Sequence, residues 1–230
     1  NFAASLKEIR GYEYQIRSSQ GVIKSWTGYD PGDIQIQAVT PVSLLVTGLN
    51  LVNNTQYYCD VRAKYNDGNY SDIGSSDGIL VDYTIPTITS FTAPAYAGSK
   101  GVKLDWQAAD PESGVKCYLG LGMNPGEMDV TKGWISIGNL KTYQISVDST
   151  GVPIKFENGR KYYATLMVEN GSGLAVQQTS PAITIDLTPP PTPVVLDDGS
   201  YTNRADRLRA NWKWTKPDPE SGIREYLYTI

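Results

Sequence analysis

Residues 102–114 read VKLDWQAADPESG, and residues 210–222 read ANWKWTKPDPESG. Both segments end in DPESG, both carry a tryptophan four residues before that ending, and they lie 108 residues apart. Ahead of each tryptophan, apolar residues alternate with polar ones, which is the pattern of a strand with one face in a core. Repetition at this interval predicts tandem copies of one all-β module.

A second repeat, at an interval of 105 residues, supports the same period. Tyr57–Ala63 reads YYCDVRA and Tyr162–Val168 reads YYATLMV, and a glycine-bearing turn follows each segment. We predict strands in which the first tyrosine and every second residue after it face inward. A third set of matching strands is expected to start at Ile9, Val115 and Ile223. In the second of these, Cys117, Leu119 and Leu121 are expected to face inward, because this register places Gly120 and Gly122 outside.

These motifs in this order resemble the fibronectin type III pattern. The residues that carry the resemblance are Trp106, Trp214, Tyr57, Tyr162, Asp110, Glu112, Gly114, Asp218, Glu220 and Gly222. The resemblance implies a seven-stranded Greek-key β-sandwich, with Tyr57 and Tyr162 in the tyrosine-corner position, where the hydroxyl bonds back to the backbone. The DPESG turn, the Ser76–Asp82 linker and the YEYQI strand at Tyr12–Ile16 are also similar to segments of large repetitive surface proteins of bacteria or archaea.

The repeats and the proline-bearing junctions predict three modules. Residues 1–85 form a module that lacks its first two strands, residues 86–187 form a complete module, and residues 188–230 supply the first strands of a further one. Two alternatives follow. Either the sequence continues in a longer array, or residues 188–230 of one chain complete the first module of the next. The second alternative would join identical chains head to tail into a filament by strand complementation.

Composition excludes several classes of function. The net charge is -4 and the basic residues are scattered, which argues against nucleic-acid binding. No apolar run approaches the ~20 residues that span a bilayer, so we expect no membrane insertion by this segment. The absence of histidine removes the usual general base and the commonest metal ligand. We therefore predict a protein that is not an enzyme and uses no cofactor or metal, and the resemblance to fibronectin type III modules and repetitive surface proteins implies one of the extracellular space or cell surface.

The acidic pairs in the DPESG segments allow other interpretations. Asp110 with Glu112, and Asp218 with Glu220, could act as general acid and base or form a weak calcium site. A turn in which Asp and Ser bond the local backbone is favoured, because the same segment recurs in two modules. The two cysteines, Cys59 and Cys117, are expected to be buried free thiols.

Aromatic side chains near loops suggest a binding role as the alternative to a structural one. Trp26, Tyr29, Tyr65 and Tyr70 could stack on sugar rings or anchor a protein partner, as in an adhesin or a carbohydrate-binding module. The competing interpretation is that Trp26 caps the core and the tyrosines are ordinary loop residues. The favoured function is a structural spacer whose partners are neighbouring modules. An adhesin would differ from such a spacer in having these aromatics gathered in one exposed patch.

Overall fold

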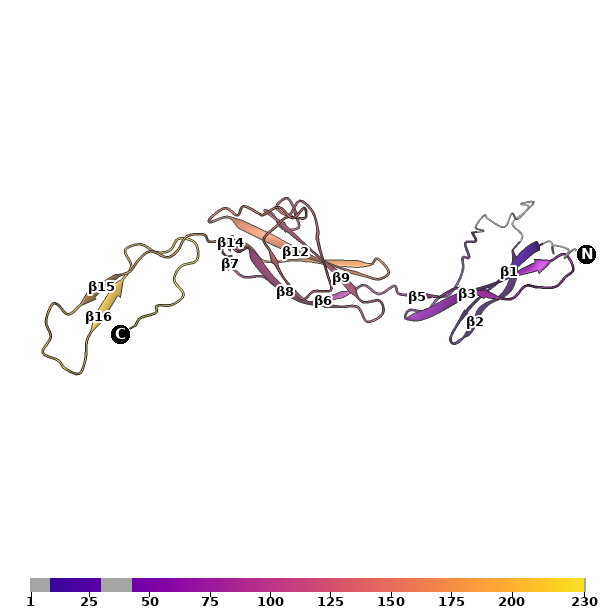
Figure 1. The fold of residues 1–230 in the computed structure, drawn as a ribbon, viewed down its shortest axis with the longest axis horizontal. Helices are drawn as coiled ribbons and strands as arrows, with labels where there is room; N and C mark the ends of the chain where they lie inside the picture. The colour runs from indigo at the N-terminus through magenta and orange to yellow at the C-terminus, as the bar shows by residue number, and fades with distance from the viewer. Residues whose placement is uncertain (1–8, 30–42, 230) are drawn as a thin grey trace, which may run out of the picture. The chain divides into compact units, whose positions relative to one another are not determined.

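The computed structural model describes residues 9–29 and 43–229 (Figure 1). These residues form strands and loops without a helix, so the all-β prediction is confirmed. Within the same ranges, no helix of sufficient length and apolar character to cross a membrane is found. The chain divides into two compact units. Unit 1 comprises residues 1–84 together with 111–113, and unit 2 comprises residues 85–110 together with 114–230.

The middle module, in unit 2, is a sandwich of two sheets. Its strands are β6 (Thr87–Thr92), β7 (Tyr96–Ala97), β8 (Val102–Ala109), β9 (Val115–Gly122), β10 (Ile135–Gly138), β11 (Thr142–Ile145), β12 (Lys161–Asn170), β13 (Ala175–Thr179) and β14 (Ile183–Ile185). One sheet has the order β11-β8-β6, and the other has the order β10-β9-β12-β14-β7, with β13 also paired to β12. This division of strands between two sheets is the fibronectin type III arrangement, so the predicted fold class is confirmed.

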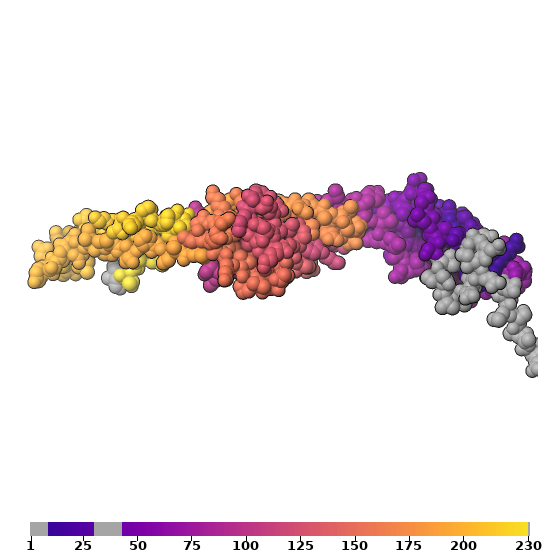
Figure 2. Space-filling view, turned by 90° about the horizontal axis from the view of Figure 1, so that it is seen from above, coloured from indigo at the N-terminus to yellow at the C-terminus, as the bar shows by residue number. Residues whose placement is uncertain are grey.

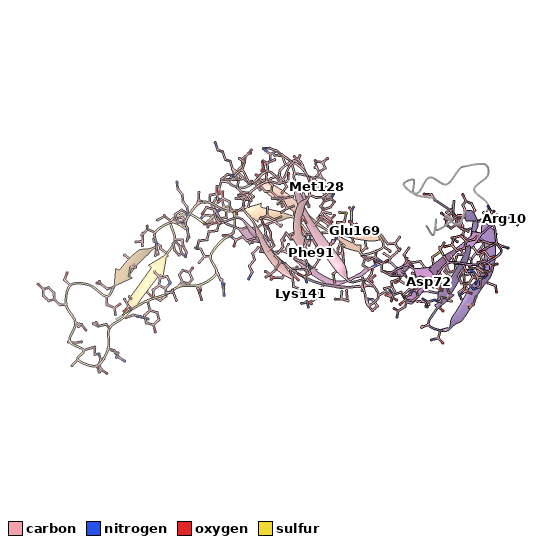
Figure 3. All side chains as sticks on the ribbon, turned by 45° about the vertical axis from the view of Figure 1, so that its right-hand side comes forward. Arg10, Asp72, Phe91, Met128, Lys141 and Glu169 are labelled. Atoms are coloured by element: carbon pink, nitrogen blue, oxygen red, sulfur yellow. The ribbon has the colours of Figure 1, made fainter. Side chains whose placement is uncertain are left out.

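The core of the middle module follows the alternation in the sequence. On β8, Val102, Leu104 and Trp106 are at most 2% exposed, whereas the residues between them face solvent. Fourteen buried apolar side chains from both sheets form one cluster, and partly buried residues such as Phe91 pack against it (Figure 3). On the face shown in Figure 2, the middle module presents a closed layer of atoms. Burial of this apolar area is the main stabilising term of the module.

The register of β9 decides which of its residues enter the core. Cys117, Leu119 and Leu121 point inward, as the sequence predicts, and each is at most 1% exposed. On the other face, a Cβ at Gly120 would lie 2.4 Å from a side-chain atom of Met128. A side chain at this position would therefore displace Met128, because the following loop packs directly on the outside of the strand.

In unit 1, the strands that the structure describes form a single sheet. They are β1 (Ile9–Ser18), β2 (Gly21–Tyr29), β3 (Thr55–Tyr65), β4 (Gly74–Ser75) and β5 (Ile79–Val81). Their order is β2-β1-β3-β4, with β5 also paired to β3. By the 105-residue repeat, β1 and β3 correspond to β9 and β12 of the middle module. The described part of unit 1 contains no counterpart of the β11-β8-β6 sheet.

The C-terminal part of unit 2 is a hairpin followed by irregular chain. Strands β15 (Val194–Asp197) and β16 (Ala210–Lys213) pair with each other and correspond to β6 and β8. The strand predicted from Ile223 onward is wrong for residues 223–229, which form no ladder. Its last residue, Ile230, lies outside the described residues. The division into three modules stays a prediction.

Candidate functional site

Two tyrosines occupy corner positions at the start of equivalent strands. The Tyr162 hydroxyl accepts a hydrogen bond from the Glu157 N–H at 3.2 Å, and the Tyr57 hydroxyl accepts one from the Val52 N–H at 2.9 Å. In both cases the bond runs five residues upstream, and both tyrosines are buried. Each bond ties the loop before the strand to the strand itself.

The DPESG segments form tight turns. In the C-terminal copy, one oxygen of Asp218 accepts from the backbone N–H groups of Glu220, Ser221 and Gly222 at 3.0–3.2 Å. Gly222 has φ +70°, a conformation that favours glycine. Asp218 is thus occupied in organising its own turn. The remaining side chains of the turn, Glu220 and Ser221, are left to bond other segments.

Glu220 and Ser221 connect the C-terminal turn to the middle module. Glu220 accepts from the Asn158 side-chain amide at 2.7 Å and from the Thr188 hydroxyl at 3.0 Å. The Ser221 hydroxyl donates to the Asp186 carboxylate, and the Asn158 carbonyl oxygen accepts from the Leu187 N–H. We call Asn158, Asp186, Thr188, Glu220 and Ser221 the junction network. It joins three segments: the loop before β12, the linker after β14, and the C-terminal DPESG turn.

Three of these bonds recur in unit 1, which includes residues 111–113. Glu112 accepts from the Asn53 side-chain amide at 2.9 Å, and the Ser113 hydroxyl donates to the Asp82 carboxylate. Asn53 also accepts from the backbone N–H of Tyr83 at 2.9 Å. The turn residues of this network were predicted from the sequence, whereas the roles of the asparagine and the linker aspartate were not. Their recurrence was readable in the sequence, at intervals of 105 and 104 residues.

The junction network also gathers negative charge. Carboxylate oxygens of Asp186, Asp218 and Glu220 lie within 4.8 Å of one another. The hydrogen bond from Ser221 and those from Thr188 lower the pKa of Asp186, which keeps this carboxyl ionised. Carboxylates are the ligand type that hard divalent cations such as Ca²⁺ prefer, so these three residues could hold one.

None of the acidic pairs has the arrangement of an acid and base facing a substrate. Asp110 is buried and accepts from the Asn170 amide at 3.2 Å, while Glu112 bonds Asn53. Their counterparts, Asp218 and Glu220, bond the turn backbone and the junction network. The geometry therefore assigns these carboxylates structural bonds rather than a reaction.

The outer face of the unit 1 sheet carries a stack of cations and aromatic rings. The Arg62 guanidinium lies over the rings of Trp26 and Tyr70, at 4.2 and 3.8 Å from their centroids, and pairs with Glu13 at 2.6 Å. The Tyr70 hydroxyl also donates to Glu13 at 2.9 Å. Trp26 thus lies over a cation on the outside of the sheet instead of capping a core.

The four candidate ligand-binding aromatics are divided between the faces of that sheet. Trp26 and Tyr70 contact Arg62 on the outer face. Tyr29 pairs with Tyr12, and Tyr65 continues the alternation from Tyr57, which places both at positions of the opposite face. The structure therefore does not gather these four side chains into one exposed patch.

The two cysteines differ in environment. Cys117 is 1% exposed, and burial raises the pKa of its thiol. Cys59 is also free, but its side chain is exposed on β3. The prediction of two buried thiols is therefore wrong for Cys59, because no described strand covers that face of unit 1.

A second ion pair on the outer face makes the stability of unit 1 depend on pH. Arg17 donates to Asp60 at 2.7 Å and Ser75 donates to it at 2.7 Å, which lowers the pKa of the Asp60 carboxyl. A carboxyl with a lowered folded-state pKa adds stability above its unfolded pKa of about 3.9. That stability is lost as the pH falls through the folded pKa. We expect D60N to lower the melting temperature at pH 7. We also expect the melting temperature of D60N to fall less than that of the unsubstituted chain when the pH drops below ~4.

Thermal unfolding of unit 1 between pH 7 and pH 2, followed by circular dichroism, tests this expectation. D77N makes the same chemical change at an exposed carboxylate and serves as the control. Identical acid profiles for D60N and the unsubstituted chain would contradict the role assigned to Asp60.

The strand order, together with the two tyrosine corners, decides the type of module. The middle module is fibronectin type III-like. No protein-family model matches this sequence, and no curated protein matches it significantly. Solved structures with similar folds include the FN1–FN3 domains of chicken CNTN1, at 13% identity and TM-score 0.36, covering 91% of this chain and 67% of that one.

Two bacterial structures match this chain with similarly low sequence identity and TM-score. The fibronectin(III)-like modules of Clostridium thermocellum CbhA are 13% identical, with TM-score 0.40, covering 80% of this chain and 82% of that one. A Ca²⁺-stabilised adhesin with which an Antarctic bacterium binds ice is 13% identical, with TM-score 0.30, covering 83% of this chain. This chain spans 44% of that adhesin.

Proposed function

We propose that this chain is a non-catalytic spacer of the extracellular space or cell surface, in which the junction network fixes one β-sandwich module to the next. The observation that carries the proposal is the recurrence of the same bonds at Asn53, Asp82, Glu112 and Ser113 and at Asn158, Asp186, Glu220 and Ser221. A spacer needs both a stable module and a defined spacing between modules. The sandwich core supplies the first and the network the second.

The network restricts the junction because its bonds connect segments that are distant in sequence. Asn158 and Glu220 are 62 residues apart, and Ser221 and Asp186 are 35 apart. A linker without such bonds behaves as a tether whose modules reorient freely, which is the default for modules in one chain. Each bond to a charged group contributes about 1.5–3 kcal/mol when it is shielded from water, and less where it is exposed, as in this network. Several acting together can restrict the reorientation.

The binding and catalytic alternatives receive less support from the same residues. A sugar-binding platform needs aromatic faces gathered on one surface, and the four candidates are divided between two faces. An acid–base pair needs carboxylates free to exchange protons with a substrate, whereas these bond the backbone and the network. The spacer is therefore the function that the geometry supports best, with neighbouring modules as its partners.

Small-angle X-ray scattering of the full chain tests the proposal. We expect E220A to increase flexibility in a normalised Kratky plot and to broaden the distribution of interatomic distances, because Asn158 and Thr188 lose their common acceptor. E225A removes an exposed carboxylate three residues from the turn and should leave the profile unchanged. Circular dichroism checks that both variants remain folded. Equal scattering from E220A and the unsubstituted chain would contradict the spacer proposal.

A further inference from the structure

Two Asn–Gly pairs occur in the sequence, and one of them belongs to the junction network. They are Asn158–Gly159, in the loop before β12, and Asn170–Gly171, at the end of β12. Asparagine followed by glycine is the sequence most prone to deamidation, because glycine has no side chain to hinder attack by its backbone nitrogen on the asparagine side chain. The surroundings of each pair therefore determine whether it reacts.

Hydrogen bonds hold both reacting groups of the first pair while the junction network is intact. The Gly159 N–H, whose nitrogen would attack, donates to the Ile185 carbonyl oxygen at 2.8 Å. The Asn158 side chain, which would be attacked, donates to Glu220 at 2.7 Å and accepts from the Leu187 N–H at 2.6 Å. The attack requires a free glycine nitrogen and a rotation of the asparagine side chain. The intact network opposes both.

The second pair is protected in a different way, because its bonds do not depend on the junction. Asn170 is 3% exposed, and its amide donates to Asp110 at 3.2 Å. Its side-chain carbonyl oxygen accepts from the backbone N–H groups of Ser172 and Leu174 and from the Ser172 hydroxyl. All of these partners lie in the middle module, whereas Asn158 is exposed and its amide is held by the C-terminal turn. Opening of the junction therefore exposes only the first pair to reaction.

We propose that Asn158 is a site of spontaneous deamidation, and that this modification irreversibly breaks the junction network. The Gly159 nitrogen loses its proton and bonds to the side-chain carbonyl carbon of Asn158, and the side-chain nitrogen leaves as ammonia. Water then opens the resulting cyclic succinimide to aspartate or isoaspartate, so the step needs no oxidant. The product is a carboxylate, which cannot donate to Glu220 and carries the same charge. This inference rests on the junction network of the proposed spacer and adds a modification that ends its action.

The corresponding network in unit 1 has similar bonds without the reactive pair. Asn53 bonds Glu112 and Tyr83 as described above, but the residue that follows it is Asn54. Asn54 has φ +54° and Gly159 has φ +73°, so the two positions share the left-handed backbone conformation. The side chain of Asn54 hinders attack by its own backbone nitrogen. The network in unit 1 should therefore outlast the one at the C-terminal turn.

Peptide mapping by mass spectrometry tests the proposal on the full chain, incubated at mildly alkaline pH. We expect slow conversion of Asn158 in the unsubstituted chain and about tenfold faster conversion in E220A, because loss of a charged acceptor opens the junction more often. Asn170 should stay intact in both proteins, and E225A should react like the unsubstituted chain. G159N copies the Asn–Asn pair of unit 1 and should suppress the reaction. A Cβ at this position has room, since the nearest atom is a Glu220 oxygen at 3.9 Å.

A second measurement follows the consequence of the modification. The deamidated chain, separated by ion exchange, and the variant N158D should both show the increased flexibility expected of E220A in small-angle scattering, with unchanged circular dichroism. Equal rates of Asn158 conversion in E220A and the unsubstituted chain would overturn the proposal, as would a deamidated chain that scatters like the fresh one while E220A does not. Either result leaves the spacer function intact, because that function fails only when E220A itself leaves the scattering unchanged.

Discussion

Replacing Trp106 with alanine should lower the free energy of unfolding of the middle module by about 3–5 kcal/mol. The indole is 2% exposed and lies within the cluster that both sheets form. Its removal leaves a cavity that the surrounding strands cannot close, because interiors are close-packed. Denaturant-dependent hydrogen exchange of the β12 amides reports this module separately from the others.

A less buried tryptophan provides the control for this experiment. Trp212 occupies the corresponding strand of the C-terminal hairpin but is 44% exposed in one chain. W212A should cost about 1 kcal/mol or less, as for a surface position. Equal losses from W106A and W212A, or a loss below about 1 kcal/mol from W106A, would show that the assigned core does not hold the module together.

The second large effect is expected from G101A. Gly101 has φ +98°, and a Cβ at this position would lie 2.2 Å from the backbone oxygen of Ile145. The substitution therefore adds backbone strain and a clash with an atom that cannot move without disturbing β11. Together these should destabilise the middle module by about 3 kcal/mol.

G114A separates the two contributions to that loss. Gly114 has φ +71°, but a Cβ there meets open space, so only the backbone term remains. We expect G114A to cost about 1 kcal/mol. Urea unfolding of both variants measures the difference, and a G101A protein as stable as G114A would show that the close approach to Ile145 is absent in solution.

Much of the fold was predictable because it depends on period-two patterns and on a repeat. The alternation at Val102, Leu104 and Trp106 defined a strand and its buried side, and the inward register of Cys117 followed from placing the neighbouring glycines outside. Both signals are local, and the sandwich topology followed from the resemblance that the repeated motifs carry.

The site was harder to predict from the sequence because it depends on contacts between segments that are distant along the chain. The DPESG turns were recognisable, but the partners of Glu220 lie in a loop and a linker that carry no pattern of their own. Cys59 was expected to be buried because its neighbours alternate like a core strand. Its exposure depends on which other strands cover that face, and the local pattern does not encode this.

Pulsed electron–electron double resonance across the junction tests the junction network most directly. In a C59S background, spin labels at K141C in the middle module and N211C in the C-terminal hairpin report the distance between the two parts. We predict one narrow distance distribution, and a clearly broader one when E220A is added. Distributions of equal width with and without Glu220 would contradict the account, because the modules would then be joined by a flexible tether.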